Sequence, residues 1–407
     1  MSQTLAERII SAHAGRLVRA GEIAIVDVDA VMATDATAPF ALKAFREMGG
    51  ASVWDKNRVF LVIDHAAPAP NERVANLHKM MRDFAREQGV KLYDVGEGIC
   101  HQLMVENGHV RPGDLFLGAD SHTPTYGALG AFAVGVGSTD LAGVLLTGRT
   151  WLKVPQSVLF RLEGALRPGV TAKDVILFLI SKMGVEGAVY ESVEFTGGAV
   201  AGMTLASRMV LANMVAEMGA KAGLVDTTGL TLDAPFAPHA VDPAAGYRAV
   251  FSYDLSDLRP QIAVPHSPDN VTPIDALLGT KVDAAFIGSC TNSRLEDLRA
   301  AAEVLRGRKL SVRLTIAPAS KAVFDAALRE GVIQTLTEAG AVFITSGCGP
   351  CVGTHLGVPG DGEVIISSTN RNFQGRMGNP RSLIYLASPA VVAAAAVAGE
   401  IIDPAAL

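Results

Sequence analysis

The sequence predicts an α/β protein of more than one domain, built on mainly parallel sheets. Its 407 residues exceed the usual size of a single domain, which is roughly 100 to 200 residues. Apolar runs of strand length alternate with longer segments of helical period, as in parallel strands joined by crossover helices. Histidine, cysteine, aspartate and asparagine residues, which can take part in catalysis or binding, directly follow several of these runs. We therefore expect sheets whose strand ends carry a functional site.

The expected strands are short apolar runs bounded by turn residues. They lie at 58–63, 114–118, 282–287, 312–316, 341–345 and 363–366.

Capping residues mark the expected helices. Thr171 and Asp174 predict a helix start before the apolar run 175–180, in the pattern of a capping box. Either Asn292 or Ser293 can cap a helix over 294–305.

The alanine-rich segment 390–398 is the most membrane-like part of the chain. Spanning a membrane takes about 20 apolar residues, so this segment is too short. Ser388, Pro389 and Gly399 bracket it instead as a short buried helix.

Turn residues suggest where the domains divide. Pro168 and Gly169 precede one helix start, and Pro273 precedes another βα unit. We expect three domains, at 1–165, 166–272 and 273–407.

Charge and cysteine content exclude several classes of protein. The net charge is -6 and the basic residues are scattered, so we expect no nucleic-acid partner. The first ten residues carry charge before any apolar run, unlike a signal peptide. Four cysteines are too few for a disulfide framework in a chain of this length. We expect a cytoplasmic protein with no membrane partner.

The strand-end residues are the candidates for chemistry. In open parallel sheets the ligand crevice lies beyond the carboxyl ends of the strands. One histidine or cysteine at such a place is more often packed than catalytic, but a set of them favours a site. The set comprises Asp64-His65, Asp120 to His122, Ser289 to Asn292, Gly347-Cys348 and Asn370 to Asn372.

Cys348 and Cys351 form a Cys-Gly-Pro-Cys tetrapeptide, which also occurs in redox dithiols. A redox dithiol lowers the pKa of its first cysteine by placing it at the start of a helix. Gly353, Gly357 and Pro359 follow closely and disfavour such a helix. The sequence therefore argues against a dithiol.

Cys290 adds a third thiol that could converge with Cys348 and Cys351. Three thiolates suit zinc, with His355 as a fourth ligand, or an iron–sulfur cluster with one iron free of cysteine. Spacing alone leaves both open, although an open iron explains more, because it can help a hydroxyl depart. We assign Cys100, on an expected helix, to packing.

Several motifs carry a resemblance to the aconitase superfamily, and within it to the isopropylmalate dehydratase type. The resemblance runs nearly end to end. Its motifs are Asp64-His65, 118–124, 137–140, 193–195, 213–220, 287–294, 348–351 and 369–376. It implies three α/β/α domains with mainly parallel sheets around a central cleft. The fourth, swivelling domain of aconitase-like enzymes has no counterpart here, which implies a small partner subunit that supplies it.

The resemblance implies a [4Fe-4S] cluster held by Cys290, Cys348 and Cys351, with one iron not ligated by cysteine. It also implies a hydro-lyase that moves a hydroxyl of a hydroxy dicarboxylic acid between adjacent carbons, by dehydration and rehydration.

The resemblance further implies roles for individual side chains. Asp64 and His65 match a pair that handles the proton of the leaving hydroxyl, a task that suits histidine near neutral pH. His122 and Asp140 match a second such pair, and Glu194 matches a carboxylate close to the reacting oxygen.

Substrate binding is implied for four further residues. Arg371 and Arg376 match residues that hold substrate carboxylates, which suits the planar guanidinium fork. Asn370 lies beside them, and Thr34 matches a position near the substrate. Relatives usually carry histidine or glutamine where Thr34 stands. The isopropylmalate type also often carries asparagine where Ala66 stands. Because of these two departures the expected substrate is a 2- or 3-hydroxy diacid, with isopropylmalate favoured and dimethylmalate and homoaconitate as alternatives.

Two other classes of function compete. A cluster-based iron or oxygen sensor that binds RNA is disfavoured by the acidic charge. A zinc-stabilised hydrolase would leave the Asp-His pairs and the arginines unexplained.

Overall fold

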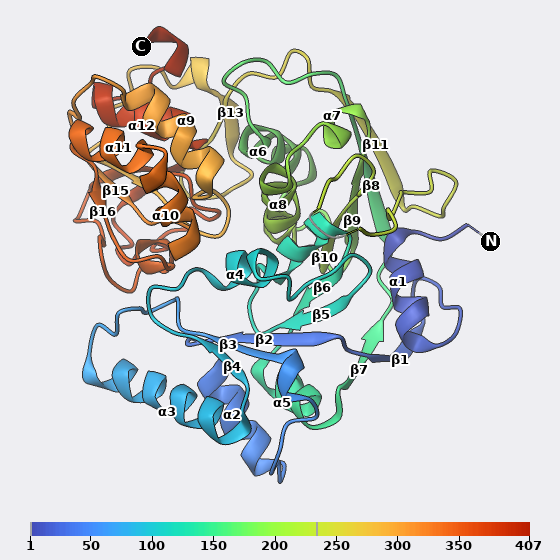
Figure 1. Cartoon of the computed structure of the whole chain (residues 1–407). Helices are drawn as coiled ribbons and strands as arrows, with labels where there is room; N and C mark the ends of the chain where they lie inside the picture. The colour runs from blue at the N-terminus through green and yellow to red at the C-terminus, as the bar shows by residue number, and fades with distance from the viewer. Residues whose placement is uncertain (1, 233–234) are drawn as a thin grey trace.

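The computed structural model describes residues 2–232 and 235–407, which build three mainly parallel sheets and a two-stranded ribbon (Figure 1). This confirms the predicted α/β class. The ribbon pairs β1 (Ile23–Asp27) with β7 (Arg149–Lys153) in antiparallel register. Within the described residues, no helix is both long and apolar enough to cross a membrane.

The first sheet has the order β4-β3-β2-β5-β6 and is parallel throughout. Its strands are β2 (Ala30–Thr34), β3 (Val59–Val62), β4 (Lys91–Tyr93), β5 (Leu115–Gly118) and β6 (Phe132–Gly135). The helices of this region are α1 (Leu5–Ala14), α2 (Ala38–Glu47), α3 (Glu72–Gln88), α4 (Cys100–Glu106) and α5 (Ser138–Thr147), with a 3-10 helix η2 (Thr123–Leu129).

The two faces of this sheet bury different partners, because successive side chains of a strand point to opposite faces. Leu61 and Leu117 pack into a core with α1, α2, α3 and α5. Phe60 and Phe116 lie on the other face, in a cluster that includes residues of α4 and η2 and also Cys290 and Cys348. The second face therefore supports the candidate site.

The second sheet has the order β10-β9-β8-β11 and is also parallel. Its strands are β8 (Ser157–Glu163), β9 (Ser192–Thr196), β10 (Ala222–Val225) and β11 (Ala249–Asp254). Its helices are α6 (Ala172–Met183), α7 (Gly198–Ala201) and α8 (Leu205–Met214), and α8 continues into η3 (Val215–Met218). The capping box predicted for α6 is present, since the Asp174 carboxylate accepts from Thr171 N at 2.8 Å.

The third sheet has the order β13-β12-β18-β17-β14-β15-β16, and β12 runs antiparallel to both of its neighbours. Its strands are β12 (Gln261–Ala263), β13 (Val271–Pro273), β14 (Ala284–Ile287), β15 (Arg313–Ile316), β16 (Val342–Phe343), β17 (Val364–Ser367) and β18 (Leu383–Leu386). Its helices are α9 (Leu295–Leu305), α10 (Lys321–Arg329), α11 (Val332–Ala339) and α12 (Pro389–Ala398), with short 3-10 turns η4 (Ile274–Ala276), η5 (Gly349–Val352) and η6 (Pro404–Ala406).

The start of α9 differs from the prediction. Its N-cap is Arg294, not Asn292 or Ser293. The Asn292 amide bonds the Asp297 side chain at 2.9 Å, and the other Asp297 oxygen accepts the Arg294 N–H at 2.9 Å. The carboxylate thus takes the first free N–H group itself, so the helix begins later.

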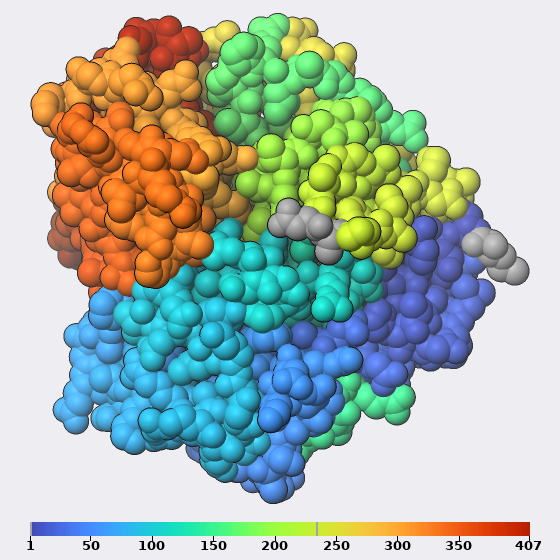
Figure 2. All heavy atoms as spheres, in the orientation of Figure 1, coloured from blue at the N-terminus to red at the C-terminus, as the bar shows by residue number. Residues whose placement is uncertain are grey.

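The sheets divide the chain somewhat earlier than the expected boundaries at 165/166 and 272/273. β8, from Ser157, already belongs to the second sheet, and β12, from Gln261, belongs to the third. Pro168 and Gly169 lie in the connection between β8 and α6, whereas Pro273 is the last residue of β13, so neither turn signal coincides with a change of sheet. The three regions lie against one another, with the orange C-terminal part touching both the cyan and the green parts (Figure 2).

Candidate active site

Strand-end residues from different sheets meet in one cavity of about 150 Å³. It is lined by His65, Ile99, Cys100, His101, Asp120, Ser121, His122, Ser289, Cys290, Cys348, Cys351, Val352, Asn370, Arg371 and Arg376. A larger cavity of about 990 Å³ lies along Gln102, Val105 and Glu106 of α4 and contains none of the cysteines. The smaller cavity is therefore the one that brings the candidate residues together.

Asp64 and His65 form a tight pair at the end of β3. His65 Nδ1 lies 2.8 Å from Asp64 Oδ1, and the other Asp64 oxygen accepts the Cys100 N–H at 2.7 Å. Asp35, next to Thr34, holds the backbone of this pair by accepting N–H groups from Asp64 at 3.0 Å and His65 at 2.8 Å. These bonds occupy Nδ1, so a proton would be exchanged with a ligand at His65 Nε2, which lies 3.3 Å from an Asp120 oxygen.

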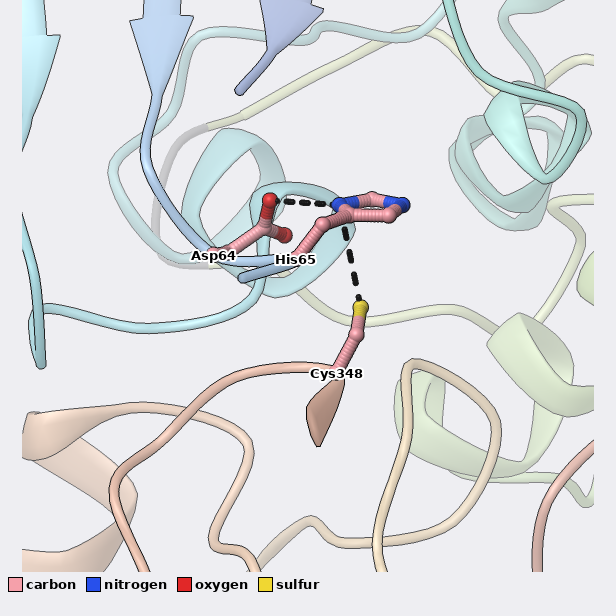
Figure 3. A group of neighbouring side chains, drawn as sticks. All are labelled: Asp64, His65 and Cys348. Atoms are coloured by element: carbon pink, nitrogen blue, oxygen red, sulfur yellow. Dashed lines mark hydrogen bonds and ion pairs between the residues drawn. The ribbon is translucent and has the colours of Figure 1, made fainter. Parts of the chain in front are cut away.

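Cys348 reaches the same pair from the third region (Figure 3). Its Sγ lies 3.9 Å from His65 Nδ1, and the ligand atoms of Asp64, His65 and Cys348 lie within 4.8 Å of one another. The Cys348 N–H also bonds the Asp64 carbonyl at 2.7 Å. A Cβ at Gly347 would lie 2.7 Å from that carbonyl, so only glycine permits this approach. The pKa of His65 rises well above its usual value, because the charges of Cys348 and Asp64 outweigh the opposing effect of burial.

Cys290 follows a strained residue. Ser289 is fully buried and has a φ of 85°, a left-handed conformation that is uncommon for serine. The Cys290 sulfur receives hydrogen bonds from the amides of Asn213 at 3.1 Å and Asn370 at 3.4 Å. Burial raises the pKa of the Cys290 thiol to about 12. A metal centre would be needed to hold this group as a thiolate near neutral pH.

Cys351 completes the set of thiols. Its Sγ lies 3.7 Å from Asn370 Oδ1 and 3.8 Å from an Arg376 nitrogen. The tetrapeptide forms only the short 3-10 turn η5, which ends at Gly353 with a φ of 70°, so the α-helix of a redox dithiol is not formed here. His355 bonds Thr354 and does not line the cavity. It is therefore not placed to join the three cysteines as the fourth ligand of a zinc ion.

His122 pairs with Glu217, not with Asp140. His122 Nε2 lies 3.0 Å from Glu217 Oε1, and Arg371 Nε lies 3.0 Å from both Glu217 oxygens. Burial and the Arg371 charge lower the pKa of His122 to about 4, against the opposing Glu217. Burial raises the pKa of Glu217, but its bond with His122 and the Arg371 charge lower it by more. His122 is therefore neutral near pH 7.

Asp140 and Glu194, two of the expected site residues, do not line this cavity. Asp140 is exposed in the first turn of α5 and does not line the cavity. Glu194 is buried on β9, where its carboxylate accepts from Ala6 N and Ser157 Oγ at 3.2 Å each. As the middle residue of a strand it faces α1, whereas the cavity lies beyond the strand ends.

Thr34 also lies outside the cavity lining. It ends β2, it is fully buried, and its hydroxyl lies 3.3 Å from that of Thr37. Its neighbour Asp35, rather than Thr34 itself, connects β2 to the His65 pair.

Three residues of the cavity wall received no chemical role from the sequence. Asp120 Oδ1 lies 2.7 Å from His101 Nε2, and its other oxygen lies 3.3 Å from His65 Nε2. Cys100, assigned to packing, is buried and lines the cavity too. The strand-end position of Asp120 was a usable signal, but His101 and Cys100 lie at the start of α4, where the sequence shows only a helix.

Arg376, the last of the expected site residues, has a buried nitrogen, Nε, without a hydrogen-bond partner among the described residues. Beside three free, buried thiols, this donor fits a site that receives an anionic group.

Comparison with known proteins identifies the family of this chain. The aconitase family (aconitate hydratase) matches residues 7–279 and 275–399. The chain is 47% identical to 3-isopropylmalate dehydratase large subunit 1 of Methanopyrus kandleri, over 99% of each chain. It is 50% identical to a probable methanogen homoaconitase large subunit of Methanosarcina mazei, over 93% of this chain and 99% of that one. Aconitase X of Thermococcus kodakaraensis, in its holo-form, has the same fold, with a TM-score of 0.55 at 14% identity and coverage of 91% and 94%. The chain therefore belongs to the aconitase family.

Proposed function

We propose that this chain is the cluster-binding large subunit of a hydro-lyase of the 3-isopropylmalate dehydratase type. It would interconvert 2-isopropylmalate and 3-isopropylmalate by dehydration and rehydration. The observation that carries the proposal is a single cavity lined by Cys290, Cys348 and Cys351 together with His65, His122, Arg371 and Arg376. Each of these histidines bonds a carboxylate behind the cavity wall, His65 that of Asp64 and His122 that of Glu217. The full-length relatives named as such large subunits support it.

Cys290, Cys348 and Cys351 would hold a [4Fe-4S] cluster with one iron free of cysteine. That iron would supply Lewis acidity toward the departing hydroxyl. The donor set supports this assignment, because the three thiols are free and buried and His355 stands outside the cavity.

His65 would carry the proton of the departing hydroxyl. Asp64 accepts from Nδ1 and fixes the ring, so the proton moves at Nε2. Asp120 lies 3.3 Å from Nε2 and would orient it toward the cavity. In the reverse direction, the same nitrogen would accept a proton from water.

Arg371 and Arg376 would bind the carboxylates of the diacid. Glu217 holds Arg371 through the Nε atom, which leaves the terminal guanidinium nitrogens for a ligand. His122, neutral and bonded to Glu217, would offer its remaining nitrogen to the substrate.

A small partner subunit would complete the site. The relatives are named large subunits, which supports such a partner. We assign the removal of the carbon-bound proton to that subunit, along with much of the choice of substrate.

Homoaconitate is the second candidate substrate, because the probable homoaconitase large subunit of Methanosarcina mazei is 50% identical to this chain. Dimethylmalate remains a third. An RNA-binding sensor is the proposal from a different class, and the net charge of -6 argues against it.

The test is purification without oxygen, followed by iron and sulfide analysis and electron paramagnetic resonance after mild oxidation. A three-iron signal that disappears on adding ferrous iron is expected. The loaded chain, co-expressed with its small subunit, should then be assayed on 2-isopropylmalate, homocitrate and 2,3-dimethylmalate. Zinc without sulfide, or no turnover of any of these acids, would overturn the proposal.

A further inference from the structure

Lys173 is a buried cation that the proposed chemistry does not use. It has no exposed surface, and it lies in the first turn of α6, the second-region helix that begins at Ala172. Both conditions disfavour a positive charge, because burial removes hydration and the start of a helix is itself positive. A lysine in such a place needs strong compensation.

No carboxylate compensates it directly. Within the described part of the chain, no carboxylate oxygen lies within 4.0 Å of the Lys173 ammonium. Its neighbour Asp174 is occupied by Thr171 and by the Gln261 N–H. The ammonium instead donates to two carbonyls, that of Ser368 at 2.9 Å and that of Thr369 at 2.6 Å.

These carbonyls belong to the turn that follows β17 and carries site residues. Asn370, the next residue, places its side chain 3.4 Å from the Cys290 sulfur and 3.7 Å from the Cys351 sulfur. Ser368 is also tied to the Cys290 loop, since its hydroxyl lies 3.1 Å from Gly288 N. Lys173 thus reaches from the second region to the backbone that supports two cysteines.

The charge of Lys173 depends on the anions that oppose the effect of burial. Burial lowers the pKa of Lys173 to about 7, and the groups that oppose this include Asp297, Cys351, Asp174 and Cys290. The two cysteines would be thiolates in the loaded protein, and a buried cation is favoured beside such an anionic centre.

We propose that Lys173 is a positioning residue of the cysteine centre. Its ammonium fixes the 368–371 turn that presents Asn370 and Arg371, and it supplies the positive charge that balances the thiolates of Cys290 and Cys351. The charge role rests on the proposed cluster, whereas the positioning role does not.

The variant to test is Lys173→Met, which has a similar length but neither charge nor donors. Lys182→Met is the matched control, because Lys182 lies on the same helix and is exposed. Lys173→Arg keeps the charge and the donors.

The first measurement is hydrogen exchange of the full chain before any cluster is loaded. Amides of 368–371 should exchange about tenfold faster in Lys173→Met than in wild type or Lys182→Met. Unchanged exchange would overturn the positioning role even if no cluster ever forms.

The second measurement is the reduction potential of the loaded chain. Loss of a nearby positive charge disfavours uptake of an electron, so Lys173→Met should have a lower potential, and Lys173→Arg should stay close to wild type. An equal potential in Lys173→Met and Lys182→Met would overturn the charge role. Failure of the wild-type chain to load a cluster would overturn the proposed function and with it the charge role.

Discussion

His122 Nε2 lies 3.0 Å from Oε1 of Glu217, a residue 95 positions further along the chain. The same carboxylate binds Arg371 through Nε. One buried carboxylate therefore orients both a histidine and an arginine of the cavity.

We predict that Glu217→Gln lowers kcat of the enzyme with its small subunit by about 100-fold. The amide keeps the size of the side chain but loses the charge that pairs with Arg371, which costs about 3 kcal/mol of transition-state stabilisation. Steady-state kinetics on the preferred hydroxyacid would measure this loss.

Glu194→Gln is the matched control, because Glu194 is also a buried glutamate but packs against α1. It should leave kcat within about twofold of wild type, as expected for a group outside the cavity. Similar losses in the two variants would contradict the assignment of Glu217.

We predict that Cys348→Ala abolishes retention of iron, while Cys100→Ala leaves the iron content unchanged. Cys348 belongs to the proposed ligand set, whereas Cys100 only lines the cavity wall beside Ile99. Iron and sulfide should be measured after anaerobic reconstitution and desalting. The comparison is stringent because both thiols are buried in the same cavity. Equal iron loss in the two variants would contradict the assignment of Cys348 as a cluster ligand and of Cys100 as a packing residue.

Much of the site follows from sequence because strand ends are visible in it. A short apolar run predicts a strand, and the residue after a parallel strand lies at the ligand edge of its sheet. His65, His122, Cys290, Cys348 and Asn370 were all found in this way, and one cavity brings them together.

The roles of residues on helices could not be predicted from strand ends. Glu217 lies in η3, where α8 continues, and helical period alone does not tell which face meets a distant cavity. Asp140 also lies on a helix, yet its turn of α5 faces solvent. A resemblance of motifs identifies stretches such as 213–220, but the partner of each side chain depends on packing between regions far apart in sequence.

We predict that Asp35→Asn lowers the melting temperature and weakens turnover. The Asp35 carboxylate accepts N–H groups from Asp64, His65 and Ala66, and an amide nitrogen would face one of these donors. Losing a charged acceptor for buried donors costs about 2 to 3 kcal/mol.

The pH dependence of this effect has a defined sign. Burial raises the pKa of Asp35, but its bonds to His78 and to the backbone N–H groups, with the His65 charge, outweigh burial and lower it far below its usual value. Its contribution to stability is therefore present above about pH 4 and is lost as the pH falls below that value. Thermal melts should show the largest difference from wild type near pH 7, and a difference that grows toward low pH would contradict the role of the carboxylate.

Asp114 should act in the opposite sense, because burial raises its pKa to about 6, with Asp29 as a nearby like charge. The folded chain then binds this proton more tightly than the unfolded chain, whose aspartate has a pKa of about 3.9. Stability from this group is full below about pH 4 and falls as the pH rises through about 6.

Asp114→Asn keeps an oxygen to accept the Arg111 N–H, which lies 2.7 Å away in the wild type. It should raise the free energy of unfolding by about 1 to 2 kcal/mol near pH 7, or roughly 1 to 3 °C in melting temperature, and should change little near pH 4. Asp257→Asn, at a side chain that is 92% exposed, is the control and should have little effect at either pH. A destabilised Asp114→Asn at pH 7 would show that the ionised carboxylate contributes more through its bond to Arg111 than burial takes away.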